Sequence, residues 1–570
     1  MENKSELLTK FKDLLDEISS KQLNKDQKEL AYEILSKFPD NKLEYVFQFI
    51  CQRIKTGFRF DIAPEANSKV IGILQKDQSI SFELNPNKSN QNSLIISENY
   101  DALKNLIVIE RERERAGLEY KYDLIYIDPP YNTETSKDDG NSIADDKENI
   151  KANKFIYRDK YSRNGWLNLM NERLRLARQL LKDDGVIFVS IDDAEQAYLK
   201  VLMDEIFGEE NFVANINWTK KRGPGGNTSF NYSIVKNTEY ILVYAKNIEN
   251  KVFNYIKHDE QNLKKLGYVN KDEYFEERGY YKLTDLHRPS STGSFQYAES
   301  LDYLVDAPDG TKFKLYTNII KPKSACYTWG YETYLKGKEL GFIECVKNND
   351  GYWVAKRKQY QFVKFNPKTK EIVKIEAGQP YENIIDTFYS QEGGADIINI
   401  FKDKNKFDFP KPTNLIKYII NMGSYNKNAR ILDFFAGSGT TGHAVLDLNK
   451  EDGGNRTFTL VTNNENNIAQ NITYERLYRI NQGKGTENQD FPWLKNNEPY
   501  LNNLNVYKMN YYNVDLFNNQ KNIDQLIQLL TELLIDFGLN KEQIQNLKEI
   551  DLLTDLSSLK PLVKDEDGTN

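Results

Sequence analysis

Apolar residues recur at two different spacings along the chain, and these spacings predict where helices and strands lie. Residues 1–55 place apolar side chains three or four positions apart, which predicts a small helical region. Compact apolar runs at 122–128 (YDLIYID), 185–192 (GVIFVSID) and 239–246 (EYILVYAK) predict buried strands, and 165–182 predicts an amphipathic helix. Strands and helices that alternate in this order predict a parallel sheet with helices on both faces.

The alternation stops in the middle of the chain, which is irregular and rich in Lys, Tyr and Asn, and it returns later with a helix, a strand and a glycine-rich turn. Short alternating runs such as GYWVAKRKQYQFVKF indicate that this middle segment is partly β. We therefore divide the chain into a helical N-terminal region (1–90), an α/β core in two parts (91–248 and 399–485), an insertion (249–398) and a helical C-terminal region (486–570).

The bulk composition excludes several classes of protein. A chain of 570 residues with 39% hydrophobic and 28% charged residues is typical of a soluble protein with several domains. Its three cysteines and three histidines are isolated from one another, so we expect no metal site and a reducing cytoplasmic environment. The chain has no run of 18 apolar residues and no signal peptide, so we expect no membrane partner.

Charge is distributed unevenly along the chain. The net charge is −7, but residues 311–375 contain 14 Lys and Arg against 5 Asp and Glu, a local excess of +9 in a chain that is otherwise acidic. A basic island of this kind is typical of a confined nucleic-acid contact. A solvated, lysine-rich surface has the same composition, so charge alone leaves both interpretations open.

A short motif made of Asp128, Pro129, Pro130 and Tyr131 follows directly after the predicted strand at 122–128. Ligands of open α/β sheets bind outside the carboxyl ends of the strands, so we expect this motif to lie at a site. The Asp128 carboxylate and the Pro129 carbonyl can accept hydrogen bonds from an amino group on a base, which makes its nitrogen a better nucleophile. Tyr131 offers a face on which an extruded base can stack. Asp and Pro are also common in ordinary turns after strands.

A glycine turn between a predicted strand and a predicted helix indicates a cofactor site. It comprises Asp433, Phe435, Ala436, Gly437, Ser438, Gly439, Thr440 and Thr441. Glycines let a ligand approach the backbone, and the helix N-terminus, helped by the threonine hydroxyls, favours an anion such as the carboxylate of S-adenosylmethionine. Glu465 follows the next strand, where an acidic residue can bind ribose hydroxyls. The spacing of Gly437, Gly439 and Gly442 also matches a dinucleotide fingerprint, but the motif at 128–131 and the lack of a hydride-transfer acid favour S-adenosylmethionine.

With both motifs in view, the chain resembles DNA amino-methyltransferases, which combine an Asp-Pro-Pro-aromatic motif with a Phe-x-Gly-x-Gly motif. The first motif precedes the second by about 300 residues, which is the order of the β group. Blocks such as LIYIDPPYNT, EIFGEENFVANINW and DFFAGSGTTGHAVLDLN look like the modification subunit of type III restriction–modification systems, over residues 95–480. The resemblance implies catalytic and base-binding roles for Asp128 and Tyr131, and cofactor contacts for the glycine turn, Glu465 and Lys411, which would pair with the cofactor carboxylate.

The resemblance also implies an architecture and a set of partners. We expect a Rossmann-like S-adenosylmethionine-dependent methyltransferase core with an inserted α+β target-recognition domain and helical terminal extensions. Candidate DNA contacts are Lys220, Lys221, Arg222, Lys356, Arg357 and Lys358. Aromatic residues interleave with the lysines of the basic island (Tyr327, Trp329, Tyr331, Tyr334, Tyr352, Trp353 and Tyr360), where each is either a base-contacting or a core residue. The expected partners are double-stranded DNA, a second copy of the chain and a helicase–nuclease restriction subunit.

The expected activity is site-specific methylation of adenine N6 by direct in-line attack of a flipped base on the cofactor methyl group. Asp at position 128 favours adenine, whereas Ser would favour cytosine, so cytosine-N4 methylation is an alternative. Cytosine-C5 methylation is excluded because no cysteine stands in a Pro-Cys loop. The chain has no phosphate-binding G-x-x-x-x-G-K-[ST] motif, so any helicase belongs to another chain. A DNA-recognition subunit without catalysis is the remaining alternative, although both motifs are intact.

Overall fold

The computed structural model describes residues 4–17, 25–39, 42–43, 45–47, 70–86, 92–131, 163–223, 234–257, 260–291, 295–375, 378–513 and 520–559. The chain divides into two compact units, one formed by Met1–Val252 with Asn383–Asn570 and the other by Phe253–Glu382. None of the helices in the described ranges has the length and apolar character needed to cross a membrane. Within the same ranges, no three His, Cys, Asp or Glu side chains gather in a way that would hold a metal ion.

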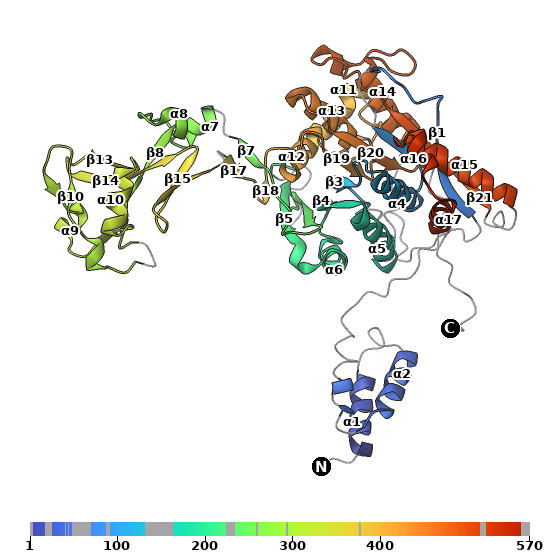
Figure 1. The fold of residues 1–570 in the computed structure, drawn as a ribbon, viewed down its shortest axis with the longest axis horizontal. Coiled ribbons are helices and arrows are strands. Elements are labelled where there is room, and N and C mark those ends of the chain that lie inside the picture. The colour runs from blue at the N-terminus through green and yellow to red at the C-terminus, as the bar shows by residue number, and fades with distance from the viewer. Residues whose placement is uncertain are drawn as a thin grey trace. The chain divides into compact units, whose positions relative to one another are not determined.

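A ten-stranded mixed sheet forms the centre of the first unit (Figure 1). Its strands lie in the order β1 (Val70–Lys76), β21 (Asn505–Asn513), β2 (Ser93–Ile96), β20 (Thr457–Thr462), β19 (Arg430–Asp433), β3 (Tyr122–Ile127), β4 (Leu181–Ile191), β6 (Thr238–Ala245), β5 (Phe212–Thr219) and β18 (Ile384–Ile385). The strands from β21 to β4 run parallel, whereas β6 is antiparallel to both of its neighbours, β4 and β5. The apolar runs of the sequence form β3, β4 and β6, as predicted.

Helices cover both faces of this sheet (Figure 1). One group contains α4 (Asn99–Arg115), α5 (Arg163–Leu180), α6 (Gln196–Phe207), α15 (Gln520–Asp536), α16 (Lys541–Gln545) and α17 (Glu549–Ser558), and the other contains α11 (Ser390–Phe401), α12 (Thr413–Gly423), α13 (Thr440–Asp452) and α14 (Glu475–Gln482). The first group shares a buried core with the sheet through residues such as Leu106, Leu174 and Leu202. The prediction of a Rossmann-like α/β core is confirmed.

Two strands in the terminal regions go beyond the sequence prediction, which expected these regions to be helical. β1 lies in the region 1–90, β21 lies in the region 486–570, and the two pair antiparallel at one edge of the sheet. The Gln75 side chain donates a hydrogen bond of 2.8 Å to the Tyr512 hydroxyl across 437 positions of sequence. Local spacing does not reveal a partner so far away. Among the described residues of the N-terminal region, α1 (Lys4–Glu17) and α2 (Lys25–Ser36) pack around a small apolar core.

The second unit, residues 253–382, is an α+β unit with its own hydrophobic core. A three-stranded antiparallel sheet of β13 (Ile343–Lys347), β14 (Trp353–Tyr360) and β8 (Tyr281–Asp285) stands beside α10 (Tyr331–Glu339). The shorter elements are β7 (Tyr255–Lys257), α7 (Glu260–Lys265), α8 (Phe275–Arg278), β9 (His287–Pro289), β10 (Val305–Asp306), β11 (Lys312–Phe313), α9 (Tyr316–Ile320), β12 (Ala325–Tyr327), β15 (Val363–Asn366), β16 (Glu371–Lys374) and β17 (Gly378–Pro380).

Most aromatic residues of the basic island belong to the core of this second unit. Tyr327, Trp329, Tyr334 and Tyr360 are buried, whereas Tyr331 and Tyr352 remain exposed. Tyr303 joins the buried group by stacking on Tyr327, with their ring centroids 4.6 Å apart. Of the two interpretations that the sequence left open, the core role therefore applies to the four buried side chains.

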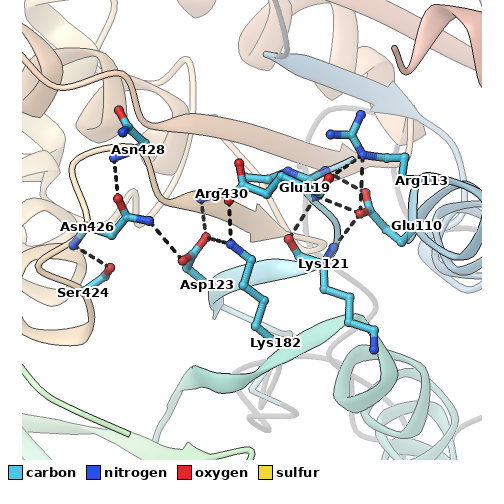
Figure 2. Close-up of polar contacts among 10 residues, drawn as sticks. All are labelled: Glu110, Arg113, Glu119, Lys121, Asp123, Lys182, Ser424, Asn426, Asn428 and Arg430. Atoms are coloured by element: carbon cyan, nitrogen blue, oxygen red, sulfur yellow. Dashed lines mark hydrogen bonds and ion pairs between the residues drawn. The ribbon is translucent and has the colours of Figure 1, made fainter. Parts of the chain in front are cut away.

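A polar network fixes the starts of β3, β4 and β19, at the sheet edge opposite their carboxyl ends (Figure 2). Arg430 at the start of β19 donates two hydrogen bonds of 2.7 and 2.6 Å to the buried Glu110 carboxylate of α4. The Arg430 backbone N–H donates to Asp123 of β3 (2.8 Å), and Lys182 of β4 donates to the same carboxylate (2.8 Å). The network therefore sets the register of the three strands relative to one another.

Replacing Arg430 with Met is expected to lower the free energy of unfolding of the first unit by about 3–5 kcal/mol, because it leaves the Glu110 carboxylate buried without its main partner. Differential scanning calorimetry will show this as a lower Tm. Arg175→Met is the matched control, since Arg175 pairs with Glu205 where both side chains are about half exposed, and its loss is expected to change stability by less than ~1 kcal/mol. Equal shifts for the two variants would contradict the assigned role of the buried pair.

Candidate active site

The two sequence motifs meet at one edge of the sheet, although they lie far apart in the chain. β19 and β3 are neighbouring parallel strands, with Leu432 opposite Ile125. Asp433 ends β19 and Asp128 follows the last residue of β3, so both carboxylates stand at the carboxyl ends of adjacent strands. This is the edge at which open α/β sheets bind their ligands.

Asp128 and Tyr131 belong to a cluster with Glu239 and Lys411. The Lys411 ammonium lies 2.9 Å from Asp128 Oδ1, 3.2 Å from Glu239 Oε2 and 2.7 Å from the Tyr131 hydroxyl. The Tyr131 hydroxyl lies 2.8 Å from Asp128 Oδ1 and 3.1 Å from Glu239 Oε2, and it donates its single proton to one of them at a time. One ammonium is thus shared by two carboxylates and a phenol, in a place where the Lys411 side chain is only 10% exposed.

The directions of the strands explain why Glu239 reaches this cluster. Because β6 is antiparallel to its neighbours, its first residues lie beside the carboxyl ends of β4 and β5, with Glu239 opposite Trp218. Lys220 follows β5 directly, and its ammonium lies 3.1 Å from Glu239 Oε1. Glu239 is not evident as a site residue from the sequence, because the direction of β6 is not visible in its apolar pattern. The available signal was an acidic residue at the head of a buried strand.

Burial and charge act in opposite directions within the cluster. Burial raises the pKa of Asp128, Glu239 raises it further, and the Lys411 ammonium opposes both. Burial also acts to raise the pKa of Glu239, but Lys411 and Lys220 outweigh it, so this pKa is lowered. Burial acts to lower the pKa of Lys411, but the two carboxylates outweigh it and raise this pKa. The cluster therefore favours a charged Lys411 and an ionised Glu239 beside a carboxylate that protonates more readily than usual.

Aromatic side chains hold the shape of the motif at 128–131. The buried Trp166 indole donates a hydrogen bond of 2.7 Å to the Pro130 carbonyl, so this carbonyl is engaged by the fold. The Lys411 ammonium lies 4.8 Å from the centroid of the Tyr131 ring and 5.7 Å from that of Trp218. Of the two proline carbonyls in the motif, that of Pro130 is therefore occupied by Trp166, and that of Pro129 is the predicted acceptor.

The glycine turn has the backbone geometry that its sequence indicates. Gly437 and Gly439 adopt positive φ angles of 49° and 75°, in a region that residues other than glycine rarely adopt. A Cβ atom at Gly439 would stand 3.2 Å from the Thr473 side chain. Gly439 is the N-cap of α13, which begins at Thr440, so the turn presents the positive end of a helix dipole at the same sheet edge.

Buried side chains stabilise this turn through hydrogen bonds. Asp433 accepts a hydrogen bond of 2.5 Å from the Thr441 hydroxyl, and burial raises the pKa of Asp433 to about 7. Arg476 of α14 is fully buried and donates to Thr440 Oγ1 (3.0 Å) and to Thr413 Oγ1 (3.0 Å). Thr413 lies two residues after Lys411, so Arg476 ties the glycine turn to the segment that carries Lys411. The sequence gives no local signal for Arg476.

The other predicted cofactor residues lie around the same turn. Phe435 and Ala436 are buried, and the Ala436 N–H donates to the Val461 carbonyl of β20 at 3.0 Å. Ser438 is also buried, and its hydroxyl lies 3.1 Å from that of Thr440. Glu465 is exposed and begins a short helical turn after β20, the strand beside β19. An exposed acidic side chain therefore follows the neighbouring strand, as the sequence pattern predicts.

The predicted DNA-contacting residues have different surroundings. Lys221 and Arg222 are exposed, and the Arg222 guanidinium lies 4.8 Å from the centroid of the Tyr389 ring. In the second unit, Lys356 pairs with Asp285 at 2.9 Å. Lys358 pairs with Asp272 at 2.7 Å and is mostly buried, and Arg357 lies between these two lysines with its guanidinium 5.8 Å from the centroid of the Trp329 ring. Exposure is therefore greatest for Lys221 and Arg222.

Comparison with known proteins identifies the family to which this site belongs. A family model described as a DNA methylase matches residues 122–475, a range that includes the motif at 128–131, the second unit and the glycine turn. The chain belongs to the DNA methylase family. A second family model, described only as an uncharacterised conserved protein, matches residues 8–116 of this DNA methylase.

Curated relatives place this DNA methylase close to two kinds of modification enzyme. It is 34% identical to the type III restriction–modification enzyme StyLTI Mod subunit of Salmonella typhimurium over 74% of this chain and 60% of that one. It is 30% identical to the EcoPI Mod subunit of Escherichia phage P1 (69% and 61%) and to the type II methyltransferase M.KpnI of Klebsiella pneumoniae (72% and 91%). The resemblance to type III modification subunits is confirmed, and the chain spans about three fifths of the length of the two Mod subunits.

Proposed function

We propose that this DNA methylase transfers a methyl group from S-adenosylmethionine to the exocyclic amino nitrogen of adenine in DNA. The observation that carries the proposal is the meeting of two motifs at neighbouring strand ends, with Asp128 after β3 and the glycine turn after β19. A base-activating carboxylate and a candidate cofactor turn thus face the same edge of one sheet. Membership of the DNA methylase family supports the same activity.

In this mechanism the chain prepares the base for direct attack. Asp128 and the Pro129 carbonyl accept hydrogen bonds from the two amino hydrogens, which leaves the nitrogen lone pair free to react. Tyr131 stacks against a base that has been extruded from the duplex, an interaction worth about 1–3 kcal/mol. The cofactor, when bound, supplies a methyl group activated by its sulfonium charge. The proton released from the amino nitrogen passes to Asp128 or to water.

The residues around the glycine turn fit the cofactor. Positive φ angles at Gly437 and Gly439 keep the turn free of side chains, and the α13 N-terminus attracts a carboxylate. The exposed Glu465 carboxylate would accept hydrogen bonds from the ribose hydroxyls. Lys411, which the sequence predicted as the partner of the cofactor carboxylate, is engaged by Asp128 and Glu239 instead. Phe435 supplies an apolar wall. We also include Asp433, Ala436, Ser438, Thr440 and Thr441 in this site because they build the turn.

Adenine rather than cytosine is the proposed base because Asp, and not Ser, opens the motif at 128–131. The matching family includes methylases of both adenine N6 and cytosine N4, so cytosine-N4 methylation is the second candidate. A DNA-recognition subunit without catalysis is less well supported, because Asp128 and Tyr131 contact each other directly beside the glycine turn.

We propose double-stranded DNA as the substrate and the second unit, within the segment 249–398, as its target-recognition domain. Similarity to Mod subunits of type III restriction–modification enzymes supports a modification subunit that works with a helicase–nuclease restriction subunit. A second copy of the chain is a further proposed partner. The core would then comprise 91–248 and 399–485 together with β1 and β21 of the two terminal regions, and α1 and α2 would be available for docking. A cytoplasmic location is proposed because DNA is the substrate.

The exposed basic residues after β5 lead to a prediction about DNA affinity. Replacing both Lys221 and Arg222 with Ala is expected to weaken DNA binding for all sequences and to reduce the salt slope of the binding constant by about 1–2, because phosphate contacts release counterions. Fluorescence anisotropy at several salt concentrations measures both quantities. Lys541→Ala, an exposed lysine on α16, is the control and should leave the slope unchanged. An unaltered slope in the double variant would remove these residues from the DNA interface.

The proposed activity is tested by incubating the protein with tritiated S-adenosylmethionine and genomic DNA that lacks methylation. We expect tritium to appear in the DNA, and single-molecule sequencing of the product to place the modified bases in one recurring sequence. DNA binding without any transfer of tritium would instead support the recognition subunit.

A further inference from the structure

The Lys411 ammonium is shared between two carboxylates, only one of which belongs to a predicted catalytic motif. It lies 2.9 Å from Asp128 Oδ1 and 3.2 Å from Glu239 Oε2, and all three side chains are largely enclosed, with exposed fractions of 10%, 27% and 12% for Lys411, Asp128 and Glu239. Two carboxylates this close in an enclosed site cannot both ionise easily unless a cation stands between them. The position of Lys411 therefore matters for the charge of Asp128.

We propose that Glu239 and Lys411 are positioning residues for methyl transfer: Glu239 holds the Lys411 ammonium beside Asp128, and this ammonium keeps Asp128 available as an ionised hydrogen-bond acceptor. The inference rests on the proposed function and extends it to residues that neither sequence motif contains. Lys220 completes the arrangement from the other side, because its ammonium binds the second oxygen of Glu239 at 3.1 Å. Glu239 thus has one cation on each oxygen, whereas Asp128 has only Lys411.

Other groups that face Asp128 do not supply a second cation. Tyr131 contributes a neutral hydroxyl. Tyr126 of β3 and Asp433 of β19 also interact electrostatically with Asp128. Asp433 is itself acidic and can only disfavour a negative charge on Asp128. Among the described residues that act on Asp128, Lys411 is therefore the cation that counters burial and the two neighbouring acids.

The proposal predicts a characteristic pH behaviour for three variants, Lys411→Met, Glu239→Gln and the double variant. Without Lys411, Asp128 has no cation beside it and still faces Glu239, which keeps Lys220. Asp128 then binds a proton more readily, and the acidic limb of the kcat–pH profile is expected to move up by about 1–3 pH units. Below that limb, each pH unit corresponds to about a tenfold loss of turnover. In the double variant, position 239 carries a neutral amide. The acidic limb of the kcat–pH profile is therefore expected to lie at a lower pH than in Lys411→Met, and turnover near pH 7 is expected to be higher than in that variant. Glu239→Gln alone is expected to lower kcat, because the Lys411 ammonium loses an anchor. It should not raise the acidic limb, because a negative charge beside Asp128 is removed.

Cofactor affinity separates this role from the alternative in which Lys411 serves mainly as the partner of the cofactor carboxylate. Calorimetric titration of the Lys411→Met variant with S-adenosylmethionine should give a Kd within about threefold of that of the unaltered protein. A large increase in this Kd, with the acidic limb unmoved, would overturn the proposal. An unchanged kcat in Glu239→Gln would overturn the part assigned to Glu239. A double variant no more active than Lys411→Met would overturn the electrostatic coupling of the two carboxylates.

Thermal stability tests the charge arrangement without any need for activity. In Lys411→Met the folded state holds an extra proton on one carboxylate, whose pKa is raised above its unfolded value, so stability is lost as pH rises through that raised pKa. The Tm deficit relative to the unaltered protein is therefore expected to grow between pH 5 and pH 8, and to grow less in the double variant. Equal pH dependence in the two variants would overturn the inference. Absence of methyl transfer by the unaltered protein would instead overturn the proposed function.

Discussion

Replacing Asp128 with Asn is expected to lower kcat for methyl transfer by about 10²–10⁴-fold. The amide has nearly the same shape as the carboxylate, but it carries no charge and is a weaker acceptor for the amino hydrogens of the base. Asp128→Ala, which removes the acceptor altogether, should abolish transfer. The Kd for S-adenosylmethionine should change little in either variant, since Lys411 keeps Glu239 as a partner at 3.2 Å. Single-turnover kinetics and calorimetry measure the two quantities separately.

Asp204→Asn is a matched control for this experiment. Like Asp128, Asp204 is about one quarter exposed and binds both a lysine ammonium and a tyrosine hydroxyl, in this case Lys200 (2.6 Å) and Tyr244 (2.7 Å), but it lies on α6. Any general effect of neutralising such a carboxylate should appear in both variants. Turnover close to the unaltered rate in Asp128→Asn, or an equal loss in Asp204→Asn, would show that Asp128 is not the acceptor.

Replacing Gly437 with Asp is expected to weaken S-adenosylmethionine binding by about 100-fold, which corresponds to ~2.7 kcal/mol. Gly437 has a φ of 49°, and the new carboxylate would stand at the helix N-terminus proposed to bind the carboxylate of the cofactor. Like charges at one site repel, and the side chain adds bulk where the backbone must be approached closely. Isothermal titration calorimetry measures the change.

Gly453→Asp controls for the backbone strain of this substitution. Gly453 also has a positive φ, 68°, but it is the C-cap of the same helix, α13, and a Cβ atom there meets nothing within 4 Å. It introduces the same side chain into a similar backbone conformation at the opposite end of the helix. We expect the Gly453 variant to bind the cofactor normally. Unchanged affinity in Gly437→Asp would reject the turn as the cofactor site.

The fold could be predicted from the sequence wherever local spacing carries the information. The segments that form β3, β4 and β6 are short apolar runs, so their composition identifies them as buried strands without knowledge of the strands with which they pair. β1 and β21 were missed because their stability comes from pairing with each other across almost the whole chain. Such pairing leaves no local period in either segment.

The candidate site could be predicted only as far as its motifs extend. Asp128 and Gly437 follow the carboxyl ends of strands, where open α/β sheets bind their ligands, so their place in the sequence already predicts a site. Glu239 reaches the site only because β6 runs against its neighbours, and Arg476 reaches the turn only through the packing of α14. The same limit applies to the basic island, where burial of Tyr327 and Tyr360 follows from packing that composition does not reveal.

The central claim is that the chain methylates the amino nitrogen of adenine, and the identity of the modified nucleoside tests it most directly. The unaltered protein is incubated with duplex DNA and S-adenosylmethionine that carries a ¹³C-labelled methyl group, the DNA is digested, and the nucleosides are separated by mass spectrometry. The account predicts labelled N6-methyladenosine in its deoxy form, and none after reaction with Asp128→Asn. Label on cytosine N4, or no labelled nucleoside with DNA and cofactor both bound, would contradict it.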